Sequence, residues 1–289
     1  MAPWLLIDAY NLAFRAFYGI PELTRSDGFP TNAIHGWVRT LWWLEDHQKP
    51  EQMVLIYDLG EPKRRTELLP QYKAQRGETP EGLSQQIPVL KAIGKAMGFG
   101  QVEQEGMEAD DLIAQWADAL NRDGKTVSIV SSDKDLAQSI RPGISQLLPP
   151  PTANPKLGWR ELDEVGVRAK FGVDPSQIPD YLALIGDTSD NIPGLTGVGP
   201  KTAALWLEQY HTLEKVIANA GRLKPPRFQN LVHQSADRLR TNLSLTRLDK
   251  ADEAPLPDIA PAKPQALLDL LTEYEMPRSY DEACKRYTA

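Results

Sequence analysis

Three short apolar segments of this chain are each followed by an aspartate, and this repetition limits the fold more than any other feature of the sequence. The segments, each with its aspartate, are Trp4–Ile7 with Asp8, Met53–Tyr57 with Asp58, and Val127–Val130 with Asp133. Continuous apolar strands separated by helical patterns are typical of a parallel sheet that helices cover on both faces. Because ligands bind outside the carboxyl ends of such strands, we expect the three aspartates to lie together. Aspartate is also common in turns and at helix N-caps, but that explains one of these positions better than all three.

More carboxylates surround the third strand. Glu108, Asp110 and Asp111 precede a helical pattern, and Asp135 follows Asp133 after the strand, which is itself reached through a predicted Asp-Gly turn. So much negative charge in one cleft repels itself unless cations or protons neutralise it. Hard divalent cations such as Mg²⁺ and Mn²⁺ choose oxygen ligands of this kind. The alternative is that the acids of the first helical turn only cap the helix and complement its dipole.

Composition indicates a globular chain that stays in the cytosol. The 289 residues suffice for one large or two modest domains, and 41% hydrophobic residues suffice for a core. The apolar runs are too short to cross a bilayer, and the N-terminus lacks the features of a secretory signal. Cys284 is the single cysteine, so an internal disulfide is excluded. The four histidines show no zinc spacing; they are His35, His47, His211 and His233.

The net charge of −7 is only a weak argument against nucleic-acid binding. Carboxylates of a metal site contribute many of these charges themselves, and the distribution of charge matters more than its sum. Two segments are locally basic, one with Lys63, Arg64, Arg65, Lys73 and Arg76, the other with Arg222, Lys224, Arg227, Arg238, Arg240 and Arg247. The first segment, poor in apolar residues up to Gly82, is expected to form a mobile arm or arch beside the carboxylates. A plain surface loop or solvated face is the alternative for each.

The pattern changes after the Pro149–Pro151 run, where we expect a domain boundary. Residues 1–158 are expected to form an α/β core with the arch at about 60–82, and residues 159–250 a helical region with helices at Glu161–Phe171 and Ile178–Ile185. Residues 251–289 are expected to form an extended connection and a C-terminal helix, Gln265–Tyr274.

The helical region carries two further signals. Asp187 and Asp190 follow a helix at a spacing of three, so a single turn can aim both at one cation. In the following GVGPKTA sequence, two glycines let backbone N–H groups approach a phosphate, and Pro200 suits the first turn of a helix. This pattern is typical of a helix-hairpin-helix that binds a DNA backbone, and a tight interhelical turn is the alternative. The chain lacks the G-x-x-x-x-G-K-[ST] sequence of a phosphate-loop NTPase.

Six motifs in order now carry a resemblance. LLIDAYN, LIYDLG, RTELLPQYKAQR, MEADDLIA, SSDKDLAQ and LIGDTSDNIPGLTGVGPKTA together resemble the 5′ nuclease (flap endonuclease) family, in particular the 5′–3′ exonuclease domain of bacterial DNA polymerase I and its stand-alone relatives. The resemblance extends from about Trp4 to Leu248. It implies an α/β fold with a mostly parallel, PIN-like central sheet, a helical arch and a C-terminal helix-hairpin-helix.

The resemblance also implies a set of metal ligands. The family's ligand positions fall on Asp8, Asp58, Glu108, Asp110, Asp111, Asp133, Asp135, Asp187 and Asp190, and all of them are carboxylates here. We expect two or more Mg²⁺ or Mn²⁺ ions. Asp8, Asp58, Glu108 and Asp110 are assigned nearer one ion, and Asp133, Asp135, Asp187 and Asp190 nearer the other, while Asp111 bridges the ions or lies outside their ligand shells.

Further roles follow from the same resemblance. In the arch, Arg65, Tyr72 and Lys73 are expected to act in catalysis and Arg76 to contact DNA, with Lys73 at the scissile phosphate. The hairpin residues expected to hold duplex phosphates are Gly197, Val198, Gly199, Pro200, Lys201 and Thr202. Backbone carbonyls expected to bind K⁺ are those of Leu184, Ile185, Pro193, Leu195 and Val198.

The implied activity is metal-dependent hydrolysis of DNA as a structure-specific 5′–3′ exonuclease and 5′-flap endonuclease. The products would carry 5′-phosphate and 3′-hydroxyl ends, as in RNA primer removal and repair. The expected substrates are double-stranded DNA with a 5′ end or single-stranded 5′ flap, and RNA–DNA hybrids, bound by a monomer with a DNA polymerase as partner. The chain is either a stand-alone member or an excised domain. A phosphatase of small molecules, a related ribonuclease fold and a catalytically dead DNA-junction module are the alternatives.

Overall fold

The computed structural model describes residues 2–249 and 257–287. Within them lies a six-stranded sheet with the order β3-β2-β1-β4-β5-β6. Its strands are β1 (Trp4–Asp8), β2 (Gln52–Leu59), β3 (Gly100–Glu105), β4 (Val127–Val130), β5 (Ile144–Leu148) and β6 (Arg160–Leu162). Strands β1 to β5 pair in parallel, and β6 is antiparallel to β5. The predicted mostly parallel sheet is therefore confirmed.

The central strands are mainly apolar because both faces of the sheet are covered. Leu5 and Ile7 of β1 pack into the core on one face, whereas Leu6 packs into the core on the other. In the register of the sheet, Asp8 of β1 lies opposite Ile56 of β2. The aspartate of each predicted strand consequently reaches the same carboxyl edge.

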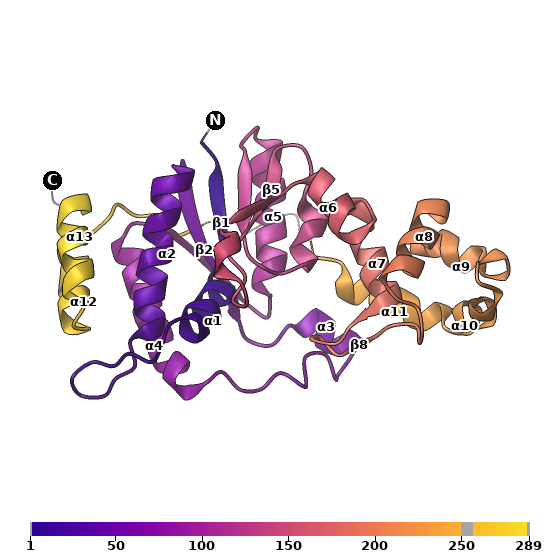
Figure 1. Ribbon diagram of the computed structural model, residues 1–289, viewed down its shortest axis with the longest axis horizontal. Helices are drawn as coiled ribbons and strands as arrows, with labels where there is room; N and C mark the ends of the chain where they lie inside the picture. Colours follow the sequence, from indigo (N-terminus) through magenta and orange to yellow (C-terminus); the bar gives the residue numbers. More distant parts are fainter. Residues whose placement is uncertain (1, 250–256, 288–289) are drawn as a thin grey trace.

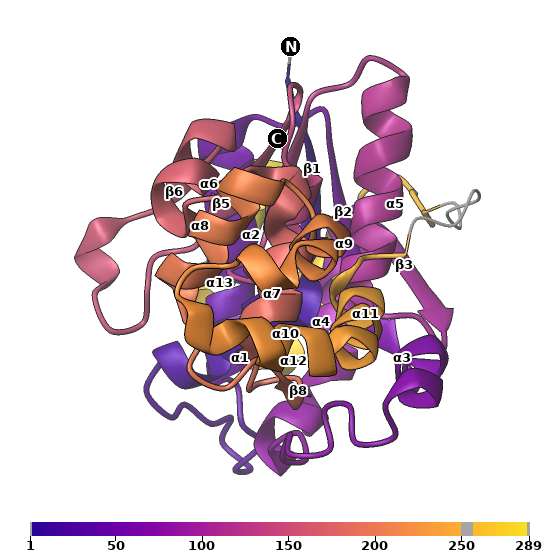
Figure 2. The same cartoon turned by 90° about the vertical axis from the view of Figure 1, so that its right-hand side faces the viewer.

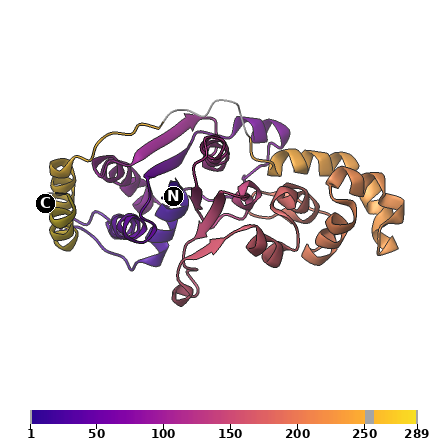
Figure 3. The ribbon, with the colours of Figure 1, turned by 90° about the horizontal axis from the view of Figure 1, so that it is seen from above.

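Helices cover the two faces unequally (Figure 1). One face carries α1 (Ala9–Gly19), α2 (Asn32–Gln48) and α4 (Glu81–Ala96), and the other carries α5 (Ala109–Arg122). The C-terminal helices α12 (Pro264–Glu273) and α13 (Pro277–Tyr287) pack outside the first group, at the far end of the molecule from the helical region (Figure 3). They therefore belong to the core of the first face.

The helical region has a core of its own and stands beside the sheet, facing the viewer in Figure 2. Its helices are α6 (Glu164–Phe171), α7 (Ile178–Ile185), α8 (Pro200–Tyr210), α9 (Leu213–Ala218), α10 (Gln229–Gln234) and α11 (Ala236–Thr246). A small ribbon of β7 (Gly186–Asp187) and β8 (Ile192–Pro193) connects α7 to the loop before α8. Short 3-10 helices lie at Asp135–Ser139, Pro155–Leu157, Pro175–Gln177, Ala220–Arg222 and Pro226–Phe228. Among the described helices, none has the length and apolar character needed to cross a membrane.

The segment between β2 and α4 runs along one edge of the molecule, next to the carboxyl ends of the strands (Figure 1). It begins with the short helix α3 (Lys63–Leu68). It ends at Pro80, the N-cap of α4. In this segment the sequence predicted residues outside the core, yet the side chains of Arg65 and Tyr72 are buried.

The sheet extends past the boundary predicted at residue 158. Residues 160–162 form β6, whereas the sequence predicted that a helix begins at Glu161. The helix begins at Glu164 instead, because the Asp163 side chain accepts a hydrogen bond of 2.8 Å from the Gly166 N–H as its N-cap.

The predicted C-terminal helix is confirmed to within one residue as α12, and α13 follows it. Residues 251–256 of the predicted extended connection, and residue 250 before them, lie outside the described residues. The later part runs beside the edge strand β3, where the Asp258 N–H donates to the Gln101 carbonyl at 3.0 Å.

Candidate metal and nucleic-acid site

A cavity of about 550 Å³ opens at the carboxyl edge of the sheet. Asp8, Asp58 and Asp133, the three aspartates that follow apolar strands, all line it. Glu108 and Asp110 join them from the start of α5, and Lys73 and Arg76 from the segment before α4. The cavity is therefore lined by both carboxylates and cationic side chains.

Backbone and hydroxyl donors fix the strand-end aspartates. Asp8 is the N-cap of α1 and accepts from the Asn11 N–H at 3.0 Å and from the Ser131 hydroxyl at 2.9 Å. Asp58 accepts from the Ala109 N–H at the start of α5, at 2.8 Å. Asp8 and Asp58 therefore accept hydrogen bonds from helix N-termini and also line the cavity, so the two roles are compatible.

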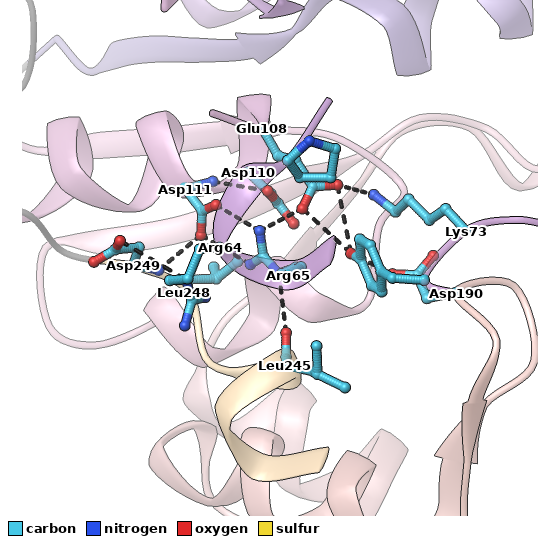
Figure 4. A network of polar contacts seen from close by, with 12 residues as sticks. Arg64, Arg65, Lys73, Glu108, Asp110, Asp111, Asp190, Leu245, Leu248 and Asp249 are labelled. Carbon is cyan, nitrogen blue, oxygen red and sulfur yellow. Dashed lines mark hydrogen bonds and ion pairs between the residues drawn. The ribbon is translucent and has the colours of Figure 1, made fainter. Parts of the chain in front are cut away.

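Glu108, Asp110 and Asp111 form the first acidic cluster, in which one oxygen of each lies within 4.8 Å of the others. The guanidinium of Arg65 is hydrogen-bonded to Glu108 and Asp111, and the Lys73 ammonium is paired with Glu108 (Figure 4). Because the three acids come from one turn at the start of α5, the helix geometry alone gathers them.

Asp135, Asp187 and Asp190 form the second acidic cluster, again with oxygens within 4.8 Å of one another. Lys134 lies 2.5 Å from Asp187, and Arg76 lies 2.7 Å from Asp190. One buried oxygen of Asp135 has no hydrogen-bond partner among the described residues. Such an atom is costly unless a ligand satisfies it, and the Lys134 ammonium, 4.0 Å away, is beyond hydrogen-bonding distance. The carboxylate oxygens of Asp187 and Asp190 beside it are the kind of ligand that a hard divalent cation prefers.

Burial and neighbouring negative charge raise the pKa of several of these acids. Burial, assisted by the Asp58 charge, raises the pKa of Asp8 to about 7. Burial and the Asp111 charge raise the pKa of Asp110 well above its ordinary value, and burial and the Asp133 charge do the same for Asp135. For Glu108, burial is outweighed by Arg65 and Lys73, and its pKa is lowered. The protein alone thus leaves negative charge under-compensated, and divalent cations fit these residues.

The stability of the metal-free protein is expected to fall between about pH 4 and pH 7 partly through Asp8. Its pKa of about 7 in the folded state exceeds the ordinary 3.8, so within that window the folded state retains a proton that the unfolded state has lost. The free energy of unfolding then decreases as pH rises, by at most about 1.4 kcal/mol per pH unit for one group.

Thermal denaturation in EDTA across this range, compared with Asp8→Asn, measures the effect. The variant should show a shallower decline than the natural sequence, and added Mg²⁺ should restore stability at pH 8. Identical pH profiles for the two proteins would contradict the assignment of a raised pKa to Asp8.

The arch residues divide into two groups. Lys73 and Arg76 line the cavity, and Lys73 has a left-handed backbone with φ of +55°. Arg65 and Tyr72 are only 2% and 6% exposed. The Tyr72 hydroxyl donates to Asp190 at 3.0 Å, and its ring packs with apolar residues of β8 and α11. In this conformation Lys73 and Arg76 are accessible to a strand of DNA, and Arg65 and Tyr72 are not.

The predicted hairpin lies at the start of α8. Gly197 has φ of +78°, Gly199 is the N-cap, and Pro200 opens the helix, followed by exposed Lys201 and half-buried Thr202. A side-chain carbon built on Gly199 would meet no atom within 4 Å. The helix N-terminus is thus open on this side, while Val198 beside it is buried.

The carbonyls predicted to bind K⁺ come from three neighbouring parts of the chain: the end of α7 with Leu184 and Ile185, strand β8 with Pro193, and the loop before α8 with Leu195 and Val198. The Leu184 carbonyl accepts from the Leu195 N–H at 2.9 Å, and the Leu195 carbonyl from the Val198 N–H at 3.0 Å. The Pro193 carbonyl accepts from the Asn242 amide at 2.8 Å. Gly194 packs directly on the Ile185 carbonyl, where a side-chain carbon would come within 2.2 Å. The structure therefore brings the end of α7 and the segment after β8 close together.

Three further residues of the site were not predicted. Asn11 lines the cavity and accepts from the Ser132 hydroxyl at 3.0 Å, Ser131 holds Asp8, and Lys134 pairs with Asp187. All lie in the quoted motifs, within three residues of a predicted ligand. Their proximity in the motif was the available signal, but their partners are distant in sequence.

Comparisons with known proteins agree with this geometry. Residues 3–172 match the family described as 5′–3′ exonuclease, N-terminal resolvase-like domain, and residues 173–266 match 5′–3′ exonuclease, C-terminal SAM fold. A 5′–3′ exonuclease of Aquifex aeolicus is 40% identical over 74% of this chain and 72% of its own length. DNA polymerase I of Deinococcus radiodurans is 38% identical over 94% of this chain, which spans only 28% of that polymerase. A flap endonuclease of bacteriophage T5, solved with DNA and metal ions, shares the fold with a TM-score of 0.69 at 20% identity, over 98% of both chains.

Proposed function

This chain belongs to the 5′–3′ exonuclease family, and on that premise we propose that it hydrolyses DNA phosphodiesters beside single-stranded 5′ ends, as an exonuclease and a 5′-flap endonuclease. The observation that carries the proposal is the cavity, in which the three strand-end aspartates meet Lys73 and Arg76. Hydrolysis of a phosphodiester needs positive charge beside the phosphate and activation of the attacking water. Lys73 and Arg76 would supply positive charge, and metal ions held by the carboxylates would activate the water.

The two acidic clusters would hold the metal ions, Mg²⁺ or Mn²⁺. Asp8, Asp58, Glu108 and Asp110 would hold one, and Asp133, Asp135, Asp187 and Asp190 the other, with Asp111 bridging or supporting. When bound, such ions supply Lewis acidity that activates water and stabilises negative charge on the phosphate. Support comes from the mutual proximity of the oxygens in each cluster and from the unpartnered oxygen of Asp135.

Besides the metal ions, a cationic side chain of the protein would stabilise the reacting phosphate. Lys73 would place its ammonium beside the scissile phosphate, where positive charge favours the transition state. Burial by itself would lower the pKa of Lys73, but the negative charges of Glu108 and its acidic neighbours outweigh this effect, and the net pKa is raised. The Lys73 amine is therefore protonated at neutral pH. Hydrolysis would leave a 5′-phosphate and a 3′-hydroxyl.

Substrate choice would depend on shape rather than on base sequence. The open N-terminus of α8 and exposed Lys201 would contact duplex phosphates, and K⁺ bound by the carbonyls of the preceding loop would add to that contact. Arg76 at the cavity mouth would contact the single strand. DNA flaps and RNA–DNA hybrids both present these features, and binding should weaken as salt rises.

The relatives named DNA polymerase I support a role next to a polymerase. In the Deinococcus protein the matching region is part of a chain more than three times as long. We therefore propose that this nuclease works with a DNA polymerase in the cytosol, removing primers or damaged 5′ strands.

A labelled 5′-flap duplex tests the proposed activity. With Mg²⁺ we expect cleavage near the junction, and with EDTA we expect none. A single strand without a duplex, a duplex with an RNA flap, and p-nitrophenyl phosphate serve as comparison substrates. Turnover of p-nitrophenyl phosphate without cleavage of the flap would refute the proposal in favour of a phosphatase, and metal-dependent binding without cleavage would indicate a junction-binding module.

A further inference from the structure

The guanidinium of Arg65 is buried, and each of its nitrogens donates a hydrogen bond. Only 2% of its surface is exposed. One face of the group binds Glu108 and Asp111, with 2.9 Å between its second terminal nitrogen and Asp111 (Figure 4). Its Nε donates to the Leu245 carbonyl at 3.0 Å. Arg65 thus joins the first acidic cluster to a carbonyl of α11.

The contact with α11 uses general properties of helix ends. The last carbonyls of a helix lack partners within the helix, and the C-terminus carries partial negative charge that attracts cations. Besides Arg65, the neighbouring Arg64 donates to the Ser244 carbonyl at 2.9 Å and to the Arg247 carbonyl at 2.8 Å. Two consecutive arginines of α3 therefore bind the carboxyl end of α11.

Helix α11 is itself fixed to α7 and to β8, the strand that precedes the predicted DNA-binding hairpin. The Asn242 amide donates to the Pro193 carbonyl at 2.8 Å and to the Ala183 carbonyl at 3.1 Å. Beyond the helix, the Asp249 N–H donates to Asp111 at 2.7 Å. The end of α11 therefore reaches Asp111 both directly and through Arg65.

We propose that Arg65 is a positioning residue, which takes its place from the end of α11 and holds Glu108 and Asp111 in the orientation that binds metal. The inference rests on the proposed function, because it assumes that these carboxylates are ligands. A planar guanidinium can bind two carboxylates and a carbonyl at fixed angles, whereas a lysine ammonium cannot reproduce this geometry. Burial also leaves Arg65 no surface for contact with the reacting DNA strand, the role that the family resemblance implied.

Mn²⁺ binding without DNA, followed by electron paramagnetic resonance, tests the proposal independently of activity. Arg65→Lys keeps the positive charge that the buried acids require, but it loses the planar guanidinium that donates to several acceptors at fixed angles. We expect its tightest Mn²⁺ dissociation constant to rise by about 10- to 100-fold, the usual effect of losing a residue that orients a ligand. Flap affinity in EDTA, measured by fluorescence anisotropy, should stay within about threefold. Arg64→Lys, next to it on α3 and bound to the same helix end without touching the acids, is the matched control and should bind Mn²⁺ normally.

The outcomes separate the inference from its premise. Absence of Mn²⁺ binding by the natural sequence would refute the proposed function itself. Normal Mn²⁺ binding by Arg65→Lys together with weakened flap binding would overturn the inference and restore Arg65 as a strand contact. Circular dichroism establishes that each protein is folded, and Arg65→Gln provides a second variant. Unfolding of both Arg65 variants at 20 °C would overturn the inference in favour of a purely structural ion pair.

Discussion

Replacing Asp133 by asparagine is expected to lower the rate of flap cleavage by about 100- to 1000-fold, the magnitude usual for losing one electrostatic group at a reacting centre. Asp133 lines the cavity and accepts from the Asp135 N–H at 2.9 Å. The asparagine carbonyl can accept the same hydrogen bond, so the turn should keep its shape. What disappears is a negative charge next to the proposed ions.

The same substitution should leave the metal-free protein at least as stable as before. The Asp133 charge contributes to the raised pKa of Asp8 and of Asp135, although burial is the larger cause for both. Removing it relieves repulsion among buried acids. Loss of activity accompanied by an unchanged or higher melting temperature in EDTA would therefore distinguish a functional charge from a structural one.

Asp163→Asn is a matched control for Asp133→Asn. Asp163 caps α6 through the Gly166 N–H, and asparagine is an equally good N-cap. The control should cleave normally and melt normally. Cleavage by Asp133→Asn at the natural rate would exclude this residue from the metal site and with it the proposed partition of the ligands.

The sequence predicted the centre of the fold better than its edges. Strands β1, β2 and β4 are continuous apolar runs because helices bury both of their faces, and such runs are recognisable. Edge strand β3 reads Gly100–Glu105 with polar side chains exposed along it, so it carries little signal. At β6, three residues pair with β5 where the sequence predicted the first turn of a helix, because pairing depends on a strand that is distant in space rather than on local pattern.

The candidate site shows the same division. The aspartates after the strands were recognisable because the topology of a parallel sheet gathers strand ends at one edge. The burial of Arg65 was not, because a basic run usually marks a solvated surface. Its partners Glu108, Asp111 and Leu245 lie 43, 46 and 180 residues away. Only the folded structure reveals that these groups compensate one another.

Replacing Lys73 by alanine is expected to lower the cleavage rate constant by about 100- to 1000-fold, again the cost of one charged group at the reacting phosphate. Lys73 is the arch cation that both lines the cavity and pairs with Glu108. Its backbone has φ of +55°, a conformation that is unfavourable for alanine and lysine alike. The substitution therefore removes the ammonium without adding backbone strain.

Lys201→Ala supplies the contrast, because Lys201 is exposed at the start of α8, outside the cavity lining. Losing one phosphate contact there should raise the Kd for flap DNA and reduce the slope of log K against log salt by about one. Single-turnover rates at saturating DNA, combined with anisotropy titrations at several salt concentrations, separate the two effects. If Lys73→Ala instead weakens binding with an unaltered single-turnover rate, then Lys73 is a binding contact like Lys201, and stabilisation of the reacting phosphate must come from other residues of the cavity.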